Sequence, residues 1–346
     1  MTEPSRAARR PTRAPTSFTL ALFALGSIAI IGVGCSADHS ARLGTIPAPL
    51  AAEAPLELLP AAGLRWLITA KPKELLGNEA FCSECSRLLP EQRLKAFALR
   101  TGIDLRAANF ALLAGYDLTT VYGVSATGIA PAAISSFRER LRDGGRIARA
   151  HPRVQRVTGT LGQTPQGLLT VGDHLALVTI GDLTLARVME AFALGRLQRS
   201  PPALRGAALA RLPATSADTV ATLYVPGPFT GEWSQAVHGL LGSSDALSVS
   251  LAPLPKGAAR FELELVGEFP PDTLERSRAA WSELSDSTTG HLLGLDAPLR
   301  PAVIRNTAER VSFAIELETA PIAAGLHAAV SGEVWQILNL PAPTPL

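Results

Sequence analysis

One order of strand and helix signals occurs twice in this chain, and this repetition limits the folds open to it more than any other feature. Leu-Pro-Ala at 59–61 precedes the strand-like segment 64–70, and Leu-Pro-Ala at 212–214 precedes the strand-like segment 219–225. A proline follows each of these segments within two residues. The first marker of the repeat therefore pairs residues about 150 positions apart.

Two further pairs of markers follow in the same order. The strand-like segments 121–128 and 261–267 each run into prolines and a helix pattern. The segments 173–180 and 309–316 each lead into another helix pattern. Three matching markers in one order would rarely arise by chance, so we expect an internal duplication.

The periodicity of apolar residues indicates which elements the repeat contains. Phe261, Leu263 and Leu265 alternate with Glu262 and Glu264, which is typical of a strand with one covered face. Apolar residues on one helical face occur in residues 134–141, 185–192 and 274–281. The combined order of strands, helices and a hairpin favours an α+β fold.

We therefore expect an α+β protein with two similar modules of antiparallel sheet and with helices packed on one face. The modules are predicted over residues 57–197 and 198–340, followed by a proline-rich tail at 341–346. Apolar residues make up 47% of the chain, which is enough for a sizeable core, and charged residues only 18%. Aromatic residues make up 5%, so the core must be mostly aliphatic.

A local pattern carries a resemblance to known proteins. Ser200-Pro-Pro-Ala-Leu-Arg205 is followed by a short helix pattern, then by Leu-Pro-Ala and a strand. This arrangement resembles a group of uncharacterised bacterial envelope proteins built from duplicated αβ modules. The resemblance covers residues 57–340, and it implies a fold and a cellular address but no reaction.

The N-terminus has the pattern of a secretory signal. Four arginines precede an apolar run at 18–34, which ends in small residues before Cys35. This end resembles the lipobox of bacterial lipoproteins, in which the cysteine is acylated and becomes the first residue. The resemblance implies a signal peptide at 1–34, lipidation of Cys35, and attachment to a membrane through N-terminal acyl chains.

Two alternatives to the lipoprotein signal remain open. The apolar run has 17 residues and would span about 26 Å as a helix, just short of a comfortable bilayer crossing. It could thus be an uncleaved anchor, or an ordinary cleaved signal. Every alternative places the rest of the chain in the cell envelope, facing the periplasm or the exterior. Residues 35–56, rich in Ala and Pro, are predicted to be a tether with a reach of about 25 Å.

Removal of the signal changes the charge balance. The chain has 32 basic and 30 acidic residues, and residues 1–34 hold four arginines and one glutamate. The remainder therefore has 28 basic and 29 acidic residues, a net charge of about −1. On this basis we expect no basic patch and no nucleic-acid partner.

Cys82-Ser-Glu-Cys85 is the sharpest local motif. Two cysteines at this spacing outside the cytoplasm can form a disulfide or a redox couple. A redox site needs its first cysteine at a helix start directly after a strand, but here the preceding strand is expected to end near Ala70, and Glu84 disfavours a thiolate. Free thiols and a metal site also remain open. We expect a structural disulfide between Cys82 and Cys85, and neither a metal nor a cofactor.

Other candidates for chemistry have simpler structural interpretations. The six histidines are scattered, without a pair at metal-binding spacing. Ser125 lies between glycines but misses the nucleophile-elbow spacing by one residue, so Gly128 is interpreted as a turn residue. Glu262 and Glu264 are interpreted as part of a solvated strand face. No phosphate-binding loop, dinucleotide fingerprint or metalloprotease helix is present in the sequence.

These observations favour a non-catalytic, membrane-anchored envelope lipoprotein that binds or scaffolds an envelope protein or another ligand. A cleft between the two modules would be the natural binding place. The alternative is an envelope enzyme, either a hydrolase with dispersed residues or a thiol oxidoreductase that uses Cys82 and Cys85.

Overall fold

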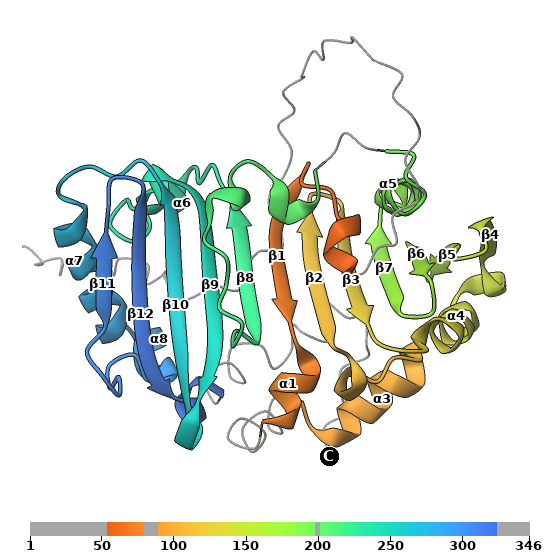
Figure 1. Cartoon of the computed structure of the whole chain (residues 1–346), viewed down its shortest axis with the longest axis horizontal. Coiled ribbons are helices and arrows are strands. Elements are labelled where there is room, and N and C mark those ends of the chain that lie inside the picture. Colours follow the sequence, from red (N-terminus) through yellow and green to blue (C-terminus); the bar gives the residue numbers. More distant parts are fainter. Residues whose placement is uncertain (1–53, 79–88, 198–200, 324–346) are drawn as a thin grey trace, which may run out of the picture. The chain divides into compact units, whose positions relative to one another are not determined.

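The computed structural model describes residues 54–78, 89–197 and 201–323, and in these residues twelve strands form one antiparallel sheet (Figure 1). The order of the strands is β11-β12-β10-β9-β8-β1-β2-β3-β7-β6-β5-β4. The expected mixture of helices with antiparallel strands is confirmed. The expectation of a separate sheet for each module is wrong, because the strands of both halves belong to a single sheet.

The elements have the following bounds. The first half contains β1 (Leu64–Ala70), β2 (Phe110–Tyr116), β3 (Thr119–Ser125), β4 (Arg146–His151), β5 (Val154–Leu161), β6 (Thr164–Val171) and β7 (Leu175–Gly181). The second half contains β8 (Ala221–Pro226), β9 (Ser244–Leu254), β10 (Ala258–Gly267), β11 (Val303–Asn306) and β12 (Arg310–Glu318). The α-helices are α1 (Pro72–Gly77), α3 (Glu91–Thr101), α4 (Ile129–Arg140), α5 (Thr184–Ala193), α6 (Glu232–Gln235), α7 (Thr273–Asp286) and α8 (Thr288–Leu293).

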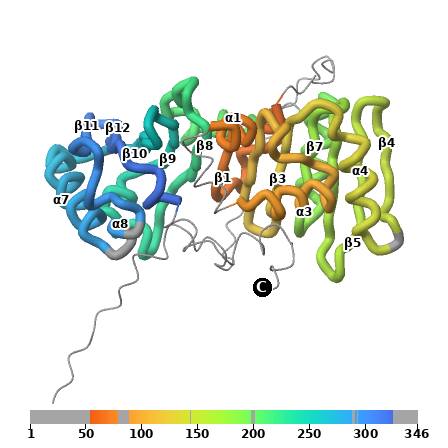
Figure 2. Tube along the Cα trace, turned by 90° about the horizontal axis from the view of Figure 1, so that it is seen from below, coloured from red at the N-terminus to blue at the C-terminus, as the bar shows by residue number. Residues whose placement is uncertain are grey.

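Strands β1 and β8 join the two halves of the sheet. They pair antiparallel, with Leu67 opposite Tyr224 and Ala70 opposite Ala221. From this pair the order continues as β2-β3-β7-β6-β5-β4 on one side and as β9-β10-β12-β11 on the other. Figure 2, seen from below, shows the strands of the two halves side by side at β1 and β8.

The helices of the first half cover both faces of the sheet. Leu169 and Leu177 belong to the same core cluster as the apolar side of α5. Their neighbours Leu168 and Val178 contact α4 instead, together with Phe137. Successive strand residues point to opposite faces, so α4 and α5 lie on opposite sides of β6 and β7. The expectation that helices pack on one face is therefore wrong here. Because helices cover both sides of β6 and β7, these strands are apolar on both faces.

The second half follows the predicted alternation more closely. Phe261, Leu263 and Leu265 of β10 pack in clusters that also contain Trp281 of α7. The same clusters include the apolar row of β12. The side chains between them on β10, among them Glu264, point to the opposite face. The prediction of one covered face is confirmed for most of β10, but Val266 at its end is buried on the opposite face.

One apolar cluster contains residues of both halves. It contains Leu67 of β1 and Leu177 of β7 together with Tyr224, Ala246 and Val266 of β8, β9 and β10. The short 3-10 turns at 55–58, 203–205 and 209–211 contribute further residues to this cluster, among them Leu58 and Leu209. The two halves therefore share one buried apolar cluster, and the second half has further clusters of its own around α7.

A close approach between β1 and β2 requires a glycine. Trp66 pairs with Gly115, and a Cβ atom built on Gly115 would lie 2.3 Å from Cε2 and Nε1 of the indole. The indole therefore lies across the backbone of the neighbouring strand, in space that any side chain at 115 would occupy.

We expect Gly115→Ala to lower the free energy of unfolding by about 1–3 kcal/mol, because the packed indole must shift. Gly77→Ala is the matched control, since nothing lies within 4 Å of a Cβ built there. Urea denaturation of both variants measures the difference. Equal midpoints for Gly115→Ala and the unsubstituted protein would contradict the packing described for Trp66.

Candidate functional site

The site residues expected from the sequence lie outside the described part of the chain. This holds for Cys35, the expected lipidation site, and for Cys82 and Cys85, the expected disulfide. The lipidation and the disulfide therefore stay predictions. The described residues contain other groupings of polar side chains.

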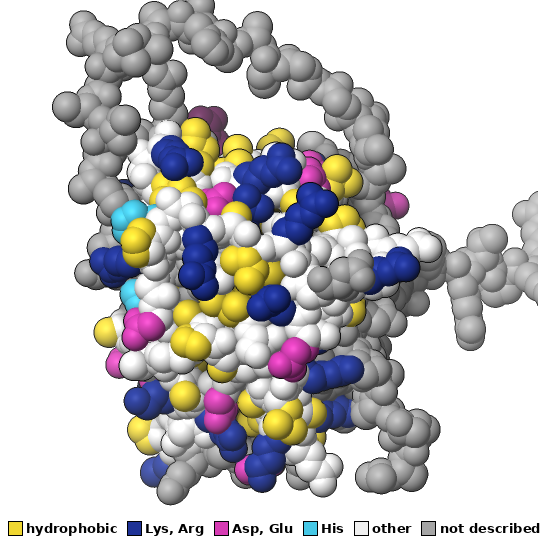
Figure 3. Space-filling model, turned by 90° about the vertical axis from the view of Figure 1, so that its right-hand side faces the viewer, with side chains coloured by type: hydrophobic (Ala, Val, Ile, Leu, Met, Phe, Trp, Pro, Cys, Tyr) yellow, Lys and Arg dark blue, Asp and Glu magenta, His cyan; other side chains and the backbone are white. Residues whose placement is uncertain are grey.

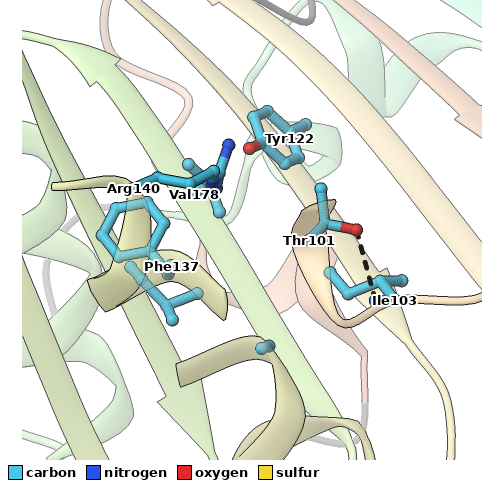
Figure 4. A pocket seen from close by; sticks show the side chains of 8 residues that line it. Thr101, Ile103, Tyr122, Phe137, Arg140 and Val178 are labelled. Carbon is cyan, nitrogen blue, oxygen red and sulfur yellow. Dashed lines mark hydrogen bonds between the residues drawn. The ribbon is translucent and has the colours of Figure 1, made fainter. Parts of the chain in front are cut away.

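The first grouping lies between α3, α4 and the sheet (Figure 4). Its lining residues are Thr101, Ile103, Tyr122, Ala133, Phe137, Arg140, Leu168 and Val178. The space between these side chains is too narrow to hold a water molecule. This place is thus a packed seam between helices and strands.

Arg140 and Tyr122 supply the polar atoms of this seam. The guanidinium carbon of Arg140 lies 5.5 Å from the centre of the Phe137 ring, at the distance of a cation–π contact. Burial raises the pKa of the Tyr122 hydroxyl, and the nearby Arg140 partly opposes this change. Arg140 Nε is buried and has no hydrogen-bond partner in the described structure. Since the seam has no room for a ligand, these contacts hold α4 against the sheet.

A partly buried ion pair lies on the opposite face of the sheet. Arg156 of β5 contacts Glu190 of α5, with Nε 2.8 Å from Oε2. Their side chains are only 18% and 13% exposed. The second carboxylate oxygen, Oε1, is buried and has no hydrogen-bond partner in the described structure. The ion pair therefore holds α5 against β5, and each side chain neutralises the charge of the other.

We expect Glu190→Gln to destabilise the fold by about 2 kcal/mol, between the losses for a surface pair and a buried one, because it leaves the partly buried Arg156 charge without its carboxylate. The double variant Arg156→Met/Glu190→Leu should recover most of that loss. Lys95→Met breaks an exposed pair with Glu91 and should cost less than about 1 kcal/mol. Chemical denaturation compares the three. If Glu190→Gln lowers the free energy of unfolding no more than Lys95→Met does, the Arg156–Glu190 pair contributes as little as a surface contact.

Glu262 and Glu264 share one face of β10, as predicted. Glu262 lies opposite Ser250, and Glu264 lies opposite Ser248 on the neighbouring strand β9. The face is polar, but Glu264 is partly buried. Burial raises the pKa of Glu264, the adjacent Glu262 raises it further, and Arg310 acts in the opposite direction. The expectation of a solvated face is therefore only partly met, because Glu264 is partly buried on it.

The raised pKa of Glu264 makes its ionisation destabilising. Its contribution to stability is full below the unfolded value, near pH 4.5, and is lost as the pH rises through the folded pKa. We therefore expect Glu264→Gln to raise the melting temperature at pH 7 and to leave it nearly unchanged at pH 4. Glu318→Gln, at an exposed position of β12, serves as the control. A lower melting temperature for Glu264→Gln at pH 7 would contradict this account.

The remaining candidates form no larger site in the described structure. His238 Nε2 lies 2.8 Å from Glu283, and His291 Nδ1 lies 2.8 Å from Asp296. Within the described ranges, no three His, Cys, Asp or Glu side chains gather in a way that could hold a metal ion. Gly128 has φ 70° directly before α4, so its predicted role as a turn residue is confirmed.

The strongest local charge lies at the β4 end of the sheet. Seven arginines fall between residues 138 and 156, against two acidic residues. Figure 3 shows this side of the molecule, where basic side chains outnumber acidic ones. The exposed members are Arg138, Arg142, Arg146, Arg149 and Arg153. None of these five lies within 4 Å of a carboxylate among the described residues.

This arginine-rich edge corrects the expectation that the chain has no basic patch. The near-neutral total charge conceals it, because the acidic residues lie elsewhere along the chain. A count of charges in a window of about twenty residues would have found it. Tyr122 beside Arg140 and Glu190 beside Arg156 had no comparable signal, since each comes from another element, β3 and α5.

In the part of the chain that the structure describes, no helix is both long and apolar enough to cross a membrane. In comparisons with known proteins, neither a family model nor a curated sequence matches this chain.

Proposed function

We propose that this chain is a lipid-anchored protein of the bacterial cell envelope whose folded part binds or scaffolds other molecules. The observation that carries the anchor is the basic segment and apolar run that end at Cys35. The predicted tether ends at residue 56, within the 3-10 turn Pro55–Leu58 that belongs to the shared core. The sheet would thus follow directly after the tether.

The binding role draws its support from the surfaces of the sheet. A sheet of twelve strands presents long faces and two edges, and one edge carries unpaired arginines. Charged, extended surfaces of this kind are suited to recognising a macromolecular partner. The seam around Arg140 lacks room for a small substrate, so the outer surface is the better candidate for recognition.

We further propose that the two halves are similar modules that arose by duplication. The order β1-β2-β3-β7-β6 matches the order β8-β9-β10-β12-β11, with a helix after the third strand in each half. The pairs β2–β3 and β9–β10 are both consecutive antiparallel neighbours. Strands β4 and β5 have no counterpart in the second half. The support for the duplication is thus the matching order and pairing of strands, and not identity between the residues of the two halves.

The anchor is tested by the mass of the protein extracted from membranes. We expect a mass that corresponds to residues 35–346 with acyl chains on Cys35, which would hold the protein firmly at about 0.8 kcal/mol per buried CH₂. Cys35→Ala should abolish both the acylation and the cleavage before residue 35. The control, Cys82→Ser/Cys85→Ser, keeps the lipidation site and should remain acylated. An unmodified mass for residues 1–346 would indicate an uncleaved helix, and a soluble product cut elsewhere would indicate an ordinary secreted protein.

A further inference from the structure

Strand β4 ends the sheet on its arginine-rich side. It pairs with β5 through Arg146 opposite Thr158 and Arg149 opposite Gln155, and no described strand pairs with its other edge. A strand at the end of a sheet presents backbone N–H and C=O groups to the outside. The edge of β4 can therefore accept one more strand.

The arginines flank this edge from both faces of the sheet. Arg146 and Arg149 are three residues apart in regular pairing, so they project to opposite faces. The irregularity in β4 comes only after Arg149. Ile147 lies between them and is 41% exposed. An extended chain placed along the edge would thus meet a positive charge on each face and an apolar side chain on one.

The charges exclude several occupants of the edge. A second copy of β4 would bring arginine against arginine, and like charges on paired strands are destabilising. The other end of the sheet, β11, carries Arg305 and is equally unsuitable. A flat anionic membrane would meet arginines of one face only. Residues 138–156 contain no Phe, Trp or Tyr on which bases could stack, which disfavours single-stranded nucleic acid.

We propose that the outer edge of β4 binds an extended acidic segment of a partner protein, which joins the sheet as a thirteenth strand. Backbone hydrogen bonds supply the affinity in such strand addition, and side chains supply the choice of partner. Acidic residues three apart in the segment meet Arg146 and Arg149. This inference rests on the proposed binding role, but it does not depend on the lipid anchor.

The experiment uses the full chain in detergent and a fluorescent peptide as the probe. The peptide contains threonine and valine with two glutamates three residues apart. A second peptide has the same sequence but carries N-methyl groups on alternate amides, which keep its charge and remove its strand hydrogen bonds. We expect the first peptide to bind and to slow hydrogen exchange of β4 amides. The N-methylated peptide should bind at least about tenfold more weakly.

Charge reversal identifies the residues responsible. Arg146→Glu/Arg149→Glu should weaken binding of the first peptide by about tenfold or more. Arg100→Glu/Arg278→Glu changes the net charge equally at exposed positions of α3 and α7 and should leave binding unchanged. Both double variants should keep the melting temperature of the unsubstituted protein within a few degrees, since all four side chains are exposed.

Four outcomes would overturn the proposal. Equal binding of the two peptides would show that charge alone acts, without strand addition. Equal weakening by the two double variants would show that the β4 edge is not the site. Binding to vesicles of anionic lipid that Arg146→Glu/Arg149→Glu abolishes, with no binding of the peptide, would identify a membrane as the partner. If the peptide fails while cross-linked partners map to other surfaces, the binding role stands and only this inference fails.

Discussion

The antiparallel pairing of β1 with β8 is the contact on which the rest of the structure depends. It turns two sets of strands into one sheet, and it places Tyr224 beside Leu67 over a common core. Without it, each half would expose an edge strand and part of an apolar face. The pair is central in the strand order, so the burial of β2 and β9 depends on it as well. The molecule is therefore better described as one sheet in two halves than as two linked modules.

Local patterns predicted the elements well but not their arrangement. The alternation around Leu263 and the helical spacing in residues 185–192 depend on neighbours in the sequence, and β10 and α5 form where they were expected. The pairing of residues 64–70 with 221–226 joins segments about 150 positions apart, which no local period can reveal. The placement of α4 and α5 on opposite faces could have been inferred from the unbroken apolar run Leu175–Val178, because a strand covered on one face alternates.

The same distinction applies to the charged groups. Arg140 and Arg156 lie within one arginine-rich stretch, yet one packs on Phe137 and the other pairs with Glu190 inside the fold. Their exposed neighbours on β4 have no such partners among the described residues. The sequence alone shows that arginines are concentrated in this stretch. Only the structure, with β4 at the end of the sheet, shows which arginines pack inside the fold and which are exposed for binding. Strands β4 and β5 are also the pair without a counterpart in the second half, so the arginine-rich edge is specific to the first half.

The most direct test of this account is the cooperativity of unfolding, measured by hydrogen exchange of the full chain in increasing denaturant. If the cluster shared by both halves and the β1–β8 pair unite the two halves, amides of β1, β2, β8 and β9 should share one free energy of opening, equal to that of global unfolding. Probes in β3 and β10 should then lose protection together. Opening of β8–β12 at lower denaturant, while β1–β7 stay protected, would contradict the account and would show two independent folding units.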